Sequence, residues 1–322
     1  MVIKGILISS IAVFENHIAN GGEKLLGNAS SIKRRPDGRV YVSGQMQRHV
    51  LFSAIDRLNR DDENRGETFV SNGDGVSNQI EVDIRSDMGG FMHPSAGDYS
   101  GRRTAPLTVT PAVALTKSEV GRDLLIRIKQ NAGESEQKQA LATREFSEYD
   151  LMHMNFFLDI TTLGISKAFE YQNEFHLNTK FFKHISEVER QRRVNLFLEA
   201  TRSLNDYANQ ARNAISGEPQ KVLIVFDEKL SRKAARYFTA SETEKNNILT
   251  ELDARGAIYF LGDDTKPAEK NESGETANYS VYSAYQKALE FLEQEENTLY
   301  DPSEKDEHGN EIIKSFSEAF GA

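Results

Sequence analysis

The sequence predicts an α+β fold, because strongly apolar segments alternate with amphipathic ones. The apolar segments, at residues 2–14, 154–165 and 221–226, are rich in β-branched and aromatic residues and predict buried strands. Residues 44–59 and 187–215 carry apolar side chains at spacings of three and four, which predicts helices. The order strand, helix, strand, helix, strand therefore favours a mixed fold with a packed sheet.

This spacing is typical of an antiparallel ferredoxin-like (RRM-like) core that carries large insertions. A doubly wound fold is the alternative, because a sequence alone does not fix the order of strands in a sheet. The first unit consists of the strand at 2–14, a polar loop, a turn at Pro36, Asp37 and Gly38, a short strand at 39–42 and the helix. Ser43 is the predicted N-cap of that helix.

The later elements are predicted with less regular patterns. Residues 60–79 are polar and are expected to form a surface insertion. The remaining expectations are a short strand at 80–84, a glycine-rich loop with large apolar residues at 85–103, an edge strand at 105–115, a charged loop or helix at 130–140, a polar-aromatic loop at 166–186, the end of the second helix at Gly217 and Pro219, helices at 242–254 and 281–295, a strand at 257–261, and a frayed acidic C-terminus.

Composition excludes several classes of protein. The 322 residues include no cysteine, so disulfides and thiolate metal sites are excluded. No segment approaches the roughly 20 apolar residues that span a bilayer. We interpret residues 5–14 as a buried strand rather than a signal peptide, and we expect a soluble, cytoplasmic protein with no membrane partner. Phosphate-loop, HExxH, GxSxG and GxGxxG signatures are absent, so we expect no enzyme, cofactor or metal.

The net charge of −10 is unevenly distributed. Residues 262–322 hold 15 acidic residues and 5 lysines, so the rest of the chain is neutral as a whole. Residues 1–60 hold 9 basic and 4 acidic residues. A basic N-terminal face is compatible with a nucleic-acid partner, although a solvated acidic tail alone also explains the asymmetry.

The start of the helix at 44–59 is the best candidate for an anion site. A helix N-terminus offers unpaired backbone N–H groups and the positive end of a dipole. Gln45, Arg48 and His49 lie in or near its first turn, and Lys33, Arg34 and Arg35 lie just upstream. A capped surface helix with solvated charges is the alternative. The aromatic segments favour nucleic acid, because bases stack on aromatic side chains.

Blocks of the sequence resemble a known family. The block VYVSGQMQRHVLFSAI resembles the strand, corner and helix of the form S-[SG]-Q-x-x-[KR] in the backbone subunit of CRISPR type I Cascade complexes, a branch of the RAMP superfamily. The block DMGGFMHP followed by GRRTAPLTVTPAVAL is similar to the finger loop of its DevR-type branch, of type I-B-like character. MNFFLDITTLGI resembles the strand that leads into the family's thumb. The three blocks keep family order over about residues 1–226.

The resemblance implies a modified RRM palm with finger and thumb insertions. It further implies a non-catalytic subunit that polymerises along the spacer of a CRISPR RNA (crRNA) and presents bases to a target DNA strand, beside other Cascade subunits. The implied division is palm first half 1–60, finger insertion 61–150, palm strand 151–165, thumb loop 166–186, palm second half 187–261 and acidic C-terminal segment 262–322.

The resemblance also implies which residues bind RNA. Phosphates are expected at Ser43, Gly44, Gln45, Arg48 and His49, with Lys33, Arg34 and Arg35 nearby. Residues expected to wedge between bases are Met88, Phe91 and Met92 in the finger and Phe169, Tyr171 and Phe175 in the thumb. Arg102 and Arg103 are expected to grip RNA or a neighbouring subunit.

Two other functions remain open at this point. The first is a type III-like backbone subunit that cleaves target RNA with a loop Asp and a divalent metal. The loop after the first strand offers Glu15, Glu23 and Asn28, but no Asp before Asp37. The second is a transcriptional regulator unrelated to CRISPR, which would bind duplex DNA, although no helix-turn-helix is apparent.

Overall fold

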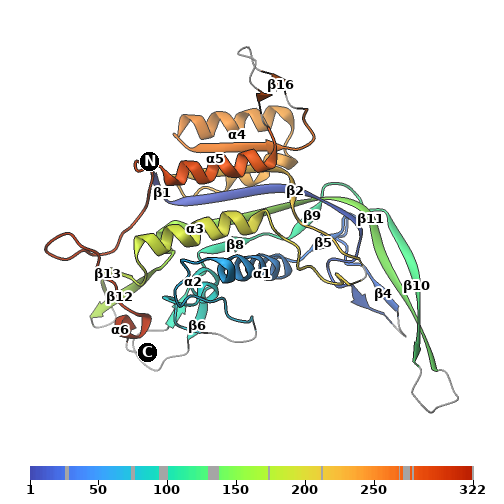
Figure 1. Ribbon diagram of the computed structural model, residues 1–322, viewed down its shortest axis with the longest axis horizontal. Coiled ribbons are helices and arrows are strands. Elements are labelled where there is room, and N and C mark those ends of the chain that lie inside the picture. Colours follow the sequence, from blue (N-terminus) through green and yellow to red (C-terminus); the bar gives the residue numbers. More distant parts are fainter. Residues whose placement is uncertain are drawn as a thin grey trace.

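The chain is built around one large, mostly antiparallel sheet with helices on both faces (Figure 1). The computed structural model describes residues 1–322 except 26–28, 74–76, 94–100, 130–137, 173–174, 212, 268, 271–275, 278 and 321–322. The predicted α+β class is confirmed. Among the helices of this described part, none is both long enough and apolar enough to cross a membrane.

The sheet has ten strands, and its central path runs β15-β14-β2-β11. The C-terminal half of β11 pairs with β2 on one side and with β8 and β9 on the other, while its N-terminal half pairs with β10 and β4. The strands are β2 (Gly5–His17), β3 (Glu23–Lys24), β4 (Ala29–Ser31), β5 (Tyr41–Val42), β8 (Leu107–Val109), β9 (Ala112–Ala114), β10 (Val120–Lys129), β11 (Lys138–Asp159), β14 (Pro219–Asp227) and β15 (Ile258–Asp263).

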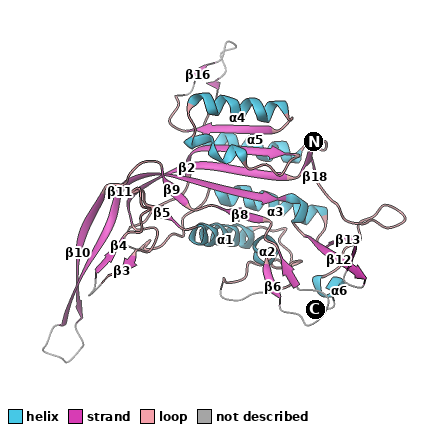
Figure 2. Cartoon of the chain, turned by 180° about the vertical axis from the view of Figure 1, so that it is seen from behind, coloured by secondary structure: helices cyan, strands magenta, loops and turns pink. Residues whose placement is uncertain are grey.

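Alternation of side chains along the strands divides the core into two layers. Ile6, Ile8 and Phe14 of β2 face helices α1 (Gly44–Asp61), α3 (Glu187–Thr201) and α5 (Val281–Glu293). Leu7 points to the other face, where it packs with η2 (Lys233–Thr239) and α4 (Glu242–Ala254). Figures 1 and 2 show α1 and α3 lying side by side.

Several predicted elements are confirmed. Ser43 caps α1, because its Oγ accepts a hydrogen bond from the Met46 amide at 3.2 Å. Helix α4 spans the predicted residues and begins with a capping box between Ser241 and Glu244. The irregular or edge strand expected at 105–115 is present as two short strands, of which β8 pairs with β11 and β9 lies between β11 and β5.

The predicted helix at 187–215 is too long, because α3 ends at Thr201. Leu204 and Tyr207 remain buried in the main core, which explains the continued apolar pattern. The chain between them and β14 is irregular, and Asn209 has the left-handed φ of 64°, which no helix accommodates.

The segments expected as the finger (61–150) and the thumb (166–186), which we continue to call by these names, contain more regular structure than predicted. Residues 80–82 form a turn rather than a strand, and Asp83 forms an isolated bridge with Phe69 and caps the short helix α2 (Ile84–Gly89). The predicted glycine-rich loop contains this helix and the paired strands β6 (Phe91–His93) and β7 (Gly101–Arg103); Tyr99 lies outside the described residues. The predicted loop at 166–186 is a hairpin of β12 (Ile165–Gln172) and β13 (Phe175–Lys183). Most of 130–140 lies outside the described residues.

The C-terminal segment is docked rather than frayed. Strand β18 (Thr298–Leu299) pairs in parallel with β1 (Val2–Ile3). The Lys183 ammonium then contacts Glu187 at 3.0 Å, Asp301 at 2.7 Å and Glu311 at 2.5 Å. Helix α6 (Phe316–Phe320) comes last in the segment. The two-residue strands β16 (Glu269–Lys270) and β17 (Thr276–Ala277) pair with each other nearer its beginning. Part of the acidity of the tail is therefore matched by cations of the same chain.

Candidate nucleic-acid interface

The start of α1 is shaped to present its backbone amides. Ser43 is exposed and uses its side chain on the Met46 amide, and the first turn contains no acidic residue that would neutralise the helix dipole. A Cβ on Gly44 would lie 3.1 Å from the Val109 carbonyl oxygen, so glycine allows the helix start to approach the β8–β9 connection closely. Gln45 is exposed beside it.

The basic residues 33–35 lie next to this corner. Arg34 forms a bridge with Val40, just before β5, and Asn20 Nδ2 donates to the carbonyls of Lys33 at 3.0 Å and Tyr41 at 3.1 Å. The Arg34 guanidinium also pairs with Glu145 at 3.3 Å. The structure therefore brings the basic residues and the corner together, as the sequence predicts.

Arg48 points into the protein, which differs from its expected role. Its guanidinium donates to the Gly89 carbonyl at the end of α2 and lies 5.7 Å from the centre of the Phe52 ring. Arg85 covers the same ring at 4.6 Å, and burial lowers the pKa of both guanidinium groups. His49, by contrast, is exposed, and its Nε2 lies 3.5 Å from a carboxylate oxygen of Asp206.

Two expected finger residues belong to the core. Met88 is fully buried because the turn of α2 directs it against the main cluster, and Phe91 is 7% exposed and packs on Phe316 with ring centres 5.2 Å apart. These positions leave no surface for a base, so the expectation that they wedge between bases is wrong for this structure. Met92 and Arg102 face each other across the β6–β7 ladder, and their side chains lie outside the described part.

Arg103 is buried and bonds to other parts of the same chain, whereas it was expected to contact RNA or a neighbouring subunit. Its guanidinium pairs with the Asp87 carboxylate and donates to the carbonyls of Thr162 at 2.8 Å and Ile165 at 2.9 Å. It also donates to Ser166 Oγ at 2.9 Å. Arg103 therefore links the end of β7, in the finger, to the start of β12, in the thumb.

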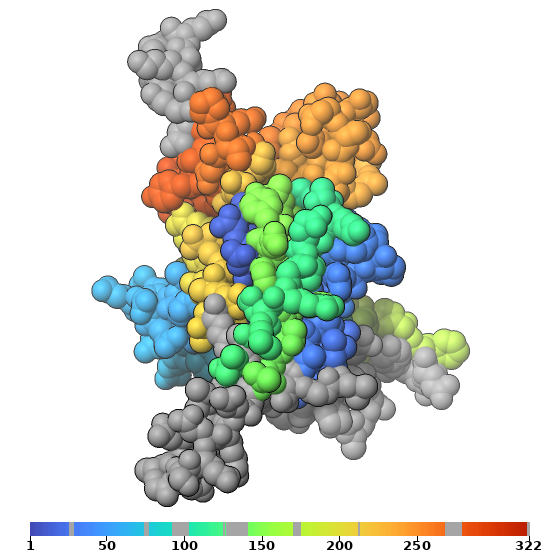
Figure 3. Space-filling view, turned by 90° about the vertical axis from the view of Figure 1, so that its right-hand side faces the viewer, coloured from blue at the N-terminus to red at the C-terminus, as the bar shows by residue number. Residues whose placement is uncertain are grey.

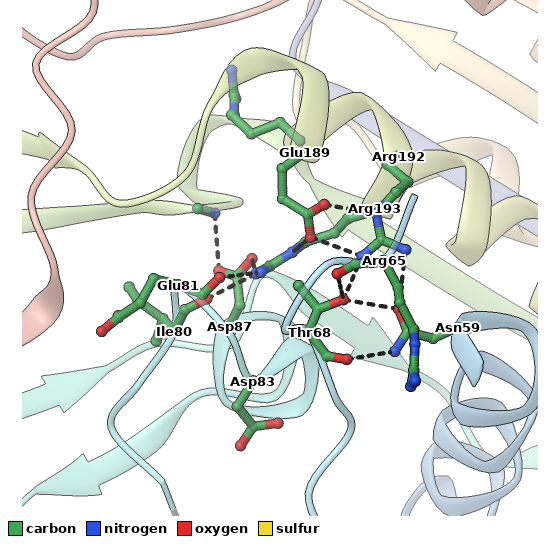
Figure 4. A network of polar contacts seen from close by, with 12 residues as sticks. Asn59, Arg65, Thr68, Ile80, Glu81, Asp83, Asp87, Glu189, Arg192 and Arg193 are labelled. Carbon is green, nitrogen blue, oxygen red and sulfur yellow. Dashed lines mark hydrogen bonds and ion pairs between the residues drawn. The ribbon is translucent and has the colours of Figure 1, made fainter. Parts of the chain in front are cut away.

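Asp87 is the centre of this link, and sequence reasoning missed it. Besides Arg103 it accepts from Arg193 Nη1 at 2.7 Å and from the Gly164 amide at 2.9 Å. Figure 4 shows Arg193 between Asp87 and Glu189, with further bonds to the carbonyls of Ile80 and Glu81 at 2.8 Å each. The spacing of Arg190 and Arg193 on the apolar side of α3, beside Val194 and Phe197, is the signal that could have predicted buried arginines.

The thumb hairpin presents aromatic side chains to solvent, as predicted. Phe169 is 51% exposed and Phe175 is 74% exposed, and the Phe169 ring packs against His176. Lys167 lies over the Phe181 ring at 5.9 Å. The Tyr171 side chain lies outside the described part. A cavity of about 220 Å³ lies between the finger and thumb roots, lined in part by Thr104, Thr162, Lys167 and Phe169.

The corner and the thumb lie far apart within one copy. Strand β5, which leads into α1, lies toward the end of the molecule from which β10 and β11 project, while β12 and β13 lie at the opposite end (Figure 1). The finger and its buried link lie between them. We call the corner and the hairpin the two candidate half-sites, and within one chain they are separate rather than parts of one closed groove.

Among the described residues, the one group of carboxylates close enough to share a cation is Glu187, Asp301 and Glu311, whose oxygens lie within 4.8 Å of one another. The Lys183 ammonium already contacts all three. Glu15 and Glu23 are exposed and are not part of this group, and Asn28 lies outside the described residues.

The sequence and the structure of the chain were compared with those of known proteins. The family described as CRISPR-associated negative auto-regulator DevR/Csa2 matches residues 8–229, more than half of the chain. A chain from a "CRISPR RNA-guided surveillance complex" is 16% identical with a TM-score of 0.53, covering 89% of this chain and 99% of that one. A chain from a "CRISPR RNA-guided surveillance complex, pre-nicking" is 12% identical with a TM-score of 0.51 and the same coverages, 89% and 99%. These likenesses show a shared fold. No curated protein sequence matches the chain. The chain belongs to the CRISPR-associated DevR/Csa2 family.

Proposed function

We propose that the chain is a non-catalytic backbone subunit of a CRISPR Cascade surveillance complex. It binds a crRNA, polymerises along the spacer and presents bases for pairing with a target DNA strand, in a cytoplasmic ribonucleoprotein with other Cascade subunits. One combination of features carries this proposal, in a chain of the DevR/Csa2 family. A helix start with no acidic residue in its first turn lies beside basic residues, and the thumb hairpin exposes aromatic side chains.

The central fold supports a ferredoxin-like palm. Counting β2, β8 with β9, β11 and β14 as strands one to four, the sheet order is four, one, three, two, with α1 and α3 on one face. This is the strand order and helix placement expected of that fold. The β6–β7 unit and the β12–β13 hairpin are insertions in it, as a finger and a thumb would be.

Separation of the half-sites supports a polymer. One helix-end charge interaction contributes roughly 0.3–1 kcal/mol, and one stacked base about 1–3 kcal/mol. A single copy would thus bind RNA weakly. When copies associate head to tail, the thumb of one approaches the corner of the next, so neighbouring copies complete the grip on a common strand. Head-to-tail contacts that do not close form an open helical filament.

Equilibrium binding of single-stranded RNA tests the proposal. We expect affinity with little sequence preference and a steep decrease with salt, because released counterions drive phosphate binding. Lys167→Glu combined with Phe175→Ala should weaken binding at least about tenfold, since a stacked base and a phosphate contact are both lost. Lys287→Glu, an exposed cation on α5, is the charge-matched control and should have little effect. Preference for a specific duplex DNA, or RNA affinity that is unchanged in the double variant, would contradict the proposal.

A further inference from the structure

The last part of the chain runs from the N-terminal strand to the thumb. We call residues 298–320 the strap, which begins at β18 beside β1 and ends in α6. Figures 1 and 2 both show α6 beside the hairpin of β12 and β13. The match to the DevR/Csa2 family ends at residue 229, so the strap lies outside the segment that the family model matches. Its role therefore has to be inferred from its own contacts.

An ion cluster joins the strap to the end of β13. The ammonium of Lys183, a buried side chain, contacts Asp301 at 2.7 Å and Glu311 at 2.5 Å, both in the strap. Its third partner is Glu187, in the first turn of α3. Removing one side of a buried ion pair is costly, because the remaining charge is left uncompensated. The strap is therefore anchored to the base of the hairpin rather than lying loosely over it.

Backbone hydrogen bonds extend this anchor. The Lys314 N–H donates to the Lys183 carbonyl at 2.9 Å, next to an isolated parallel bridge between Lys183 and Ile313. The His184 Nδ1–H donates to the Lys314 carbonyl at 2.7 Å. At this point the strap continues the hairpin sideways, as a short third strand beside β13 would.

Aromatic rings of α6 bridge the finger and the thumb. The Phe316 ring centre lies 5.2 Å from that of Phe91 in the finger. The Phe320 ring centre lies 5.7 Å from that of Phe182 in the thumb, and the two α6 rings are 4.8 Å apart. The Lys314 ammonium lies 5.4 Å from the centre of the Phe182 ring. One short helix therefore packs against both insertions.

The orientation of the thumb depends on contacts at its base. Strands β12 and β13 form a two-stranded sheet of their own, and Figure 3 shows this yellow-green hairpin projecting at the edge of the molecule. Toward the tip, Phe169, Phe175 and Leu177 are exposed. A two-stranded hairpin is only marginally stable by itself, so its base decides where its tip points. Arg103 holds the base on the β12 side, and the strap holds it on the β13 side.

We propose that the strap positions the thumb for RNA. This inference rests on the proposed crRNA-binding function and names the part of the chain that orients one of its half-sites. Asp301, Glu311 and Phe316 are positioning residues, because they contact the base of the hairpin or the finger beside it. A segment that is already held in its binding orientation loses less conformational entropy when it binds. The exposed thumb rings therefore contribute their full share of RNA affinity only while the strap is docked.

Two variants that release the strap test this role. Phe316→Ala with Phe320→Ala removes the aromatic contacts of α6 and leaves the hairpin sequence intact. Half-maximal binding to a long single-stranded RNA should then need at least about fivefold more protein, because stacking on the thumb is lost. Lys314→Pro removes the N–H that donates to the Lys183 carbonyl, keeps both rings and should act in the same direction.

The matched control removes two rings elsewhere. Phe260 on β15 and Phe291 on α5 have ring centres 6.0 Å apart, and both are partly buried against the main core. Phe260→Ala with Phe291→Ala should leave RNA affinity unchanged. Amide hydrogen exchange of residues 165–172 and 175–183 should become faster in the release variants and not in this control, because only the former free the base of the hairpin.

Two further substitutions distinguish positioning from general destabilisation. Phe175→Ala removes an exposed thumb ring, and Gln45→Glu places an acid in the first turn of α1, where it repels phosphate. Both should weaken RNA binding of the otherwise unchanged protein. In a release variant, Phe175→Ala should cause little further loss, whereas Gln45→Glu should keep its full effect.

Each outcome decides the proposal. Loss of the Phe175→Ala effect together with a retained Gln45→Glu effect supports positioning of the thumb by the strap. Unchanged RNA affinity of both release variants, or an equal Phe175→Ala effect with and without the strap contacts, overturns it. Loss of both effects indicates general structural damage and also overturns it. If the wild-type protein binds no RNA, the proposed function falls, while unchanged hydrogen exchange of the hairpin separately refutes the mechanical role of the strap.

Discussion

Replacing Asp87 by asparagine should strongly destabilise the junction of finger, thumb and α3. The carboxylate is fully buried and is shared by Arg103, Arg193 and the Gly164 amide. Asparagine has nearly the same shape, but it removes the buried negative charge that Arg103 and Arg193 share, although Arg193 keeps its ion pair with Glu189, and it turns an amide N–H toward one of the two guanidinium groups. Removing one partner of a buried ion pair costs about 3–5 kcal/mol, because the remaining charge is uncompensated.

Urea unfolding followed by circular dichroism measures this loss. With an m-value of about 3 kcal/mol/M, the expected shift of the midpoint is roughly 1 M or more toward lower urea. Asp123→Asn removes the same charge from an exposed position on β10 and should change stability by less than about 0.5 kcal/mol. If Asp87→Asn is as stable as this control, the buried cluster does not hold the finger and thumb together as described.

Three further predictions concern two buried histidines, a glycine with positive φ, and the ion cluster of Lys183. Burial lowers the pKa of His153 and of His184 from 6.5 to about 4, for His184 with help from the charge of Arg103, so both are neutral when folded. As the pH falls, each histidine takes up its proton at a higher pH in the unfolded chain than in the folded one. The free energy of unfolding therefore has its full value above pH 6.5 and decreases toward pH 4, by roughly 1.4 kcal/mol per histidine at pH 5.5. His153→Gln should flatten this dependence of the urea midpoint, and an unchanged slope would refute the assignment. Gly90→Ala should cost about 3 kcal/mol, because φ is 66° and the new Cβ would lie 2.6 Å from the Arg103 carbonyl oxygen. Gly256→Ala, at φ 72° with open space around it, should cost only about 1 kcal/mol, and equal losses in melting experiments would contradict this reasoning. Lys183→Met leaves Glu187, Asp301 and Glu311 facing one another, so limited proteolysis should cleave residues 301–311 faster than in Lys233→Met, whose lysine contacts the single carboxylate of Glu251.

Elements with one buried face were predictable from the sequence. Helices α1 and α4 carry a regular apolar pattern because one face of each packs on the sheet. The central strands β2 and β14 are largely apolar because helices cover the sheet on both of their faces. The projecting ribbons β10–β11 and β12–β13 have no such pattern, since much of each face meets solvent. Strands that are not half-buried lack the alternation that identifies a strand, and both hairpins were therefore missed or read as loops.

The candidate site was predicted where it depends on local sequence. Ser43 caps its helix, because an N-cap is decided by neighbouring residues. Phe169 and Phe175 are exposed, as expected for aromatic residues within a polar segment. The roles of Met88, Phe91 and Arg103 were not predictable, since a glycine-rich stretch indicates a surface loop. Their burial depends on partners distant in sequence, such as Thr162 for Arg103 and Phe316 for Phe91.

The acidic C-terminus illustrates the same limit. A run of carboxylates alone predicts a solvated tail, and its charge count does not reveal the cation that it meets. Lys183 lies in the polar-aromatic segment at 166–186, more than a hundred residues earlier, and the folded chain brings it to Asp301 and Glu311. The docked segment then continues to α6, whose Phe316 closes over the finger residue Phe91.

The number of copies bound to one single-stranded RNA tests the central claim most directly. Mass photometry of the protein on RNAs of increasing length counts the copies on each. If the chain is a polymerising backbone subunit, the maximum number of copies rises in proportion to RNA length and the assembly weakens as salt is raised. A single copy on every RNA, whatever its length, would contradict the account.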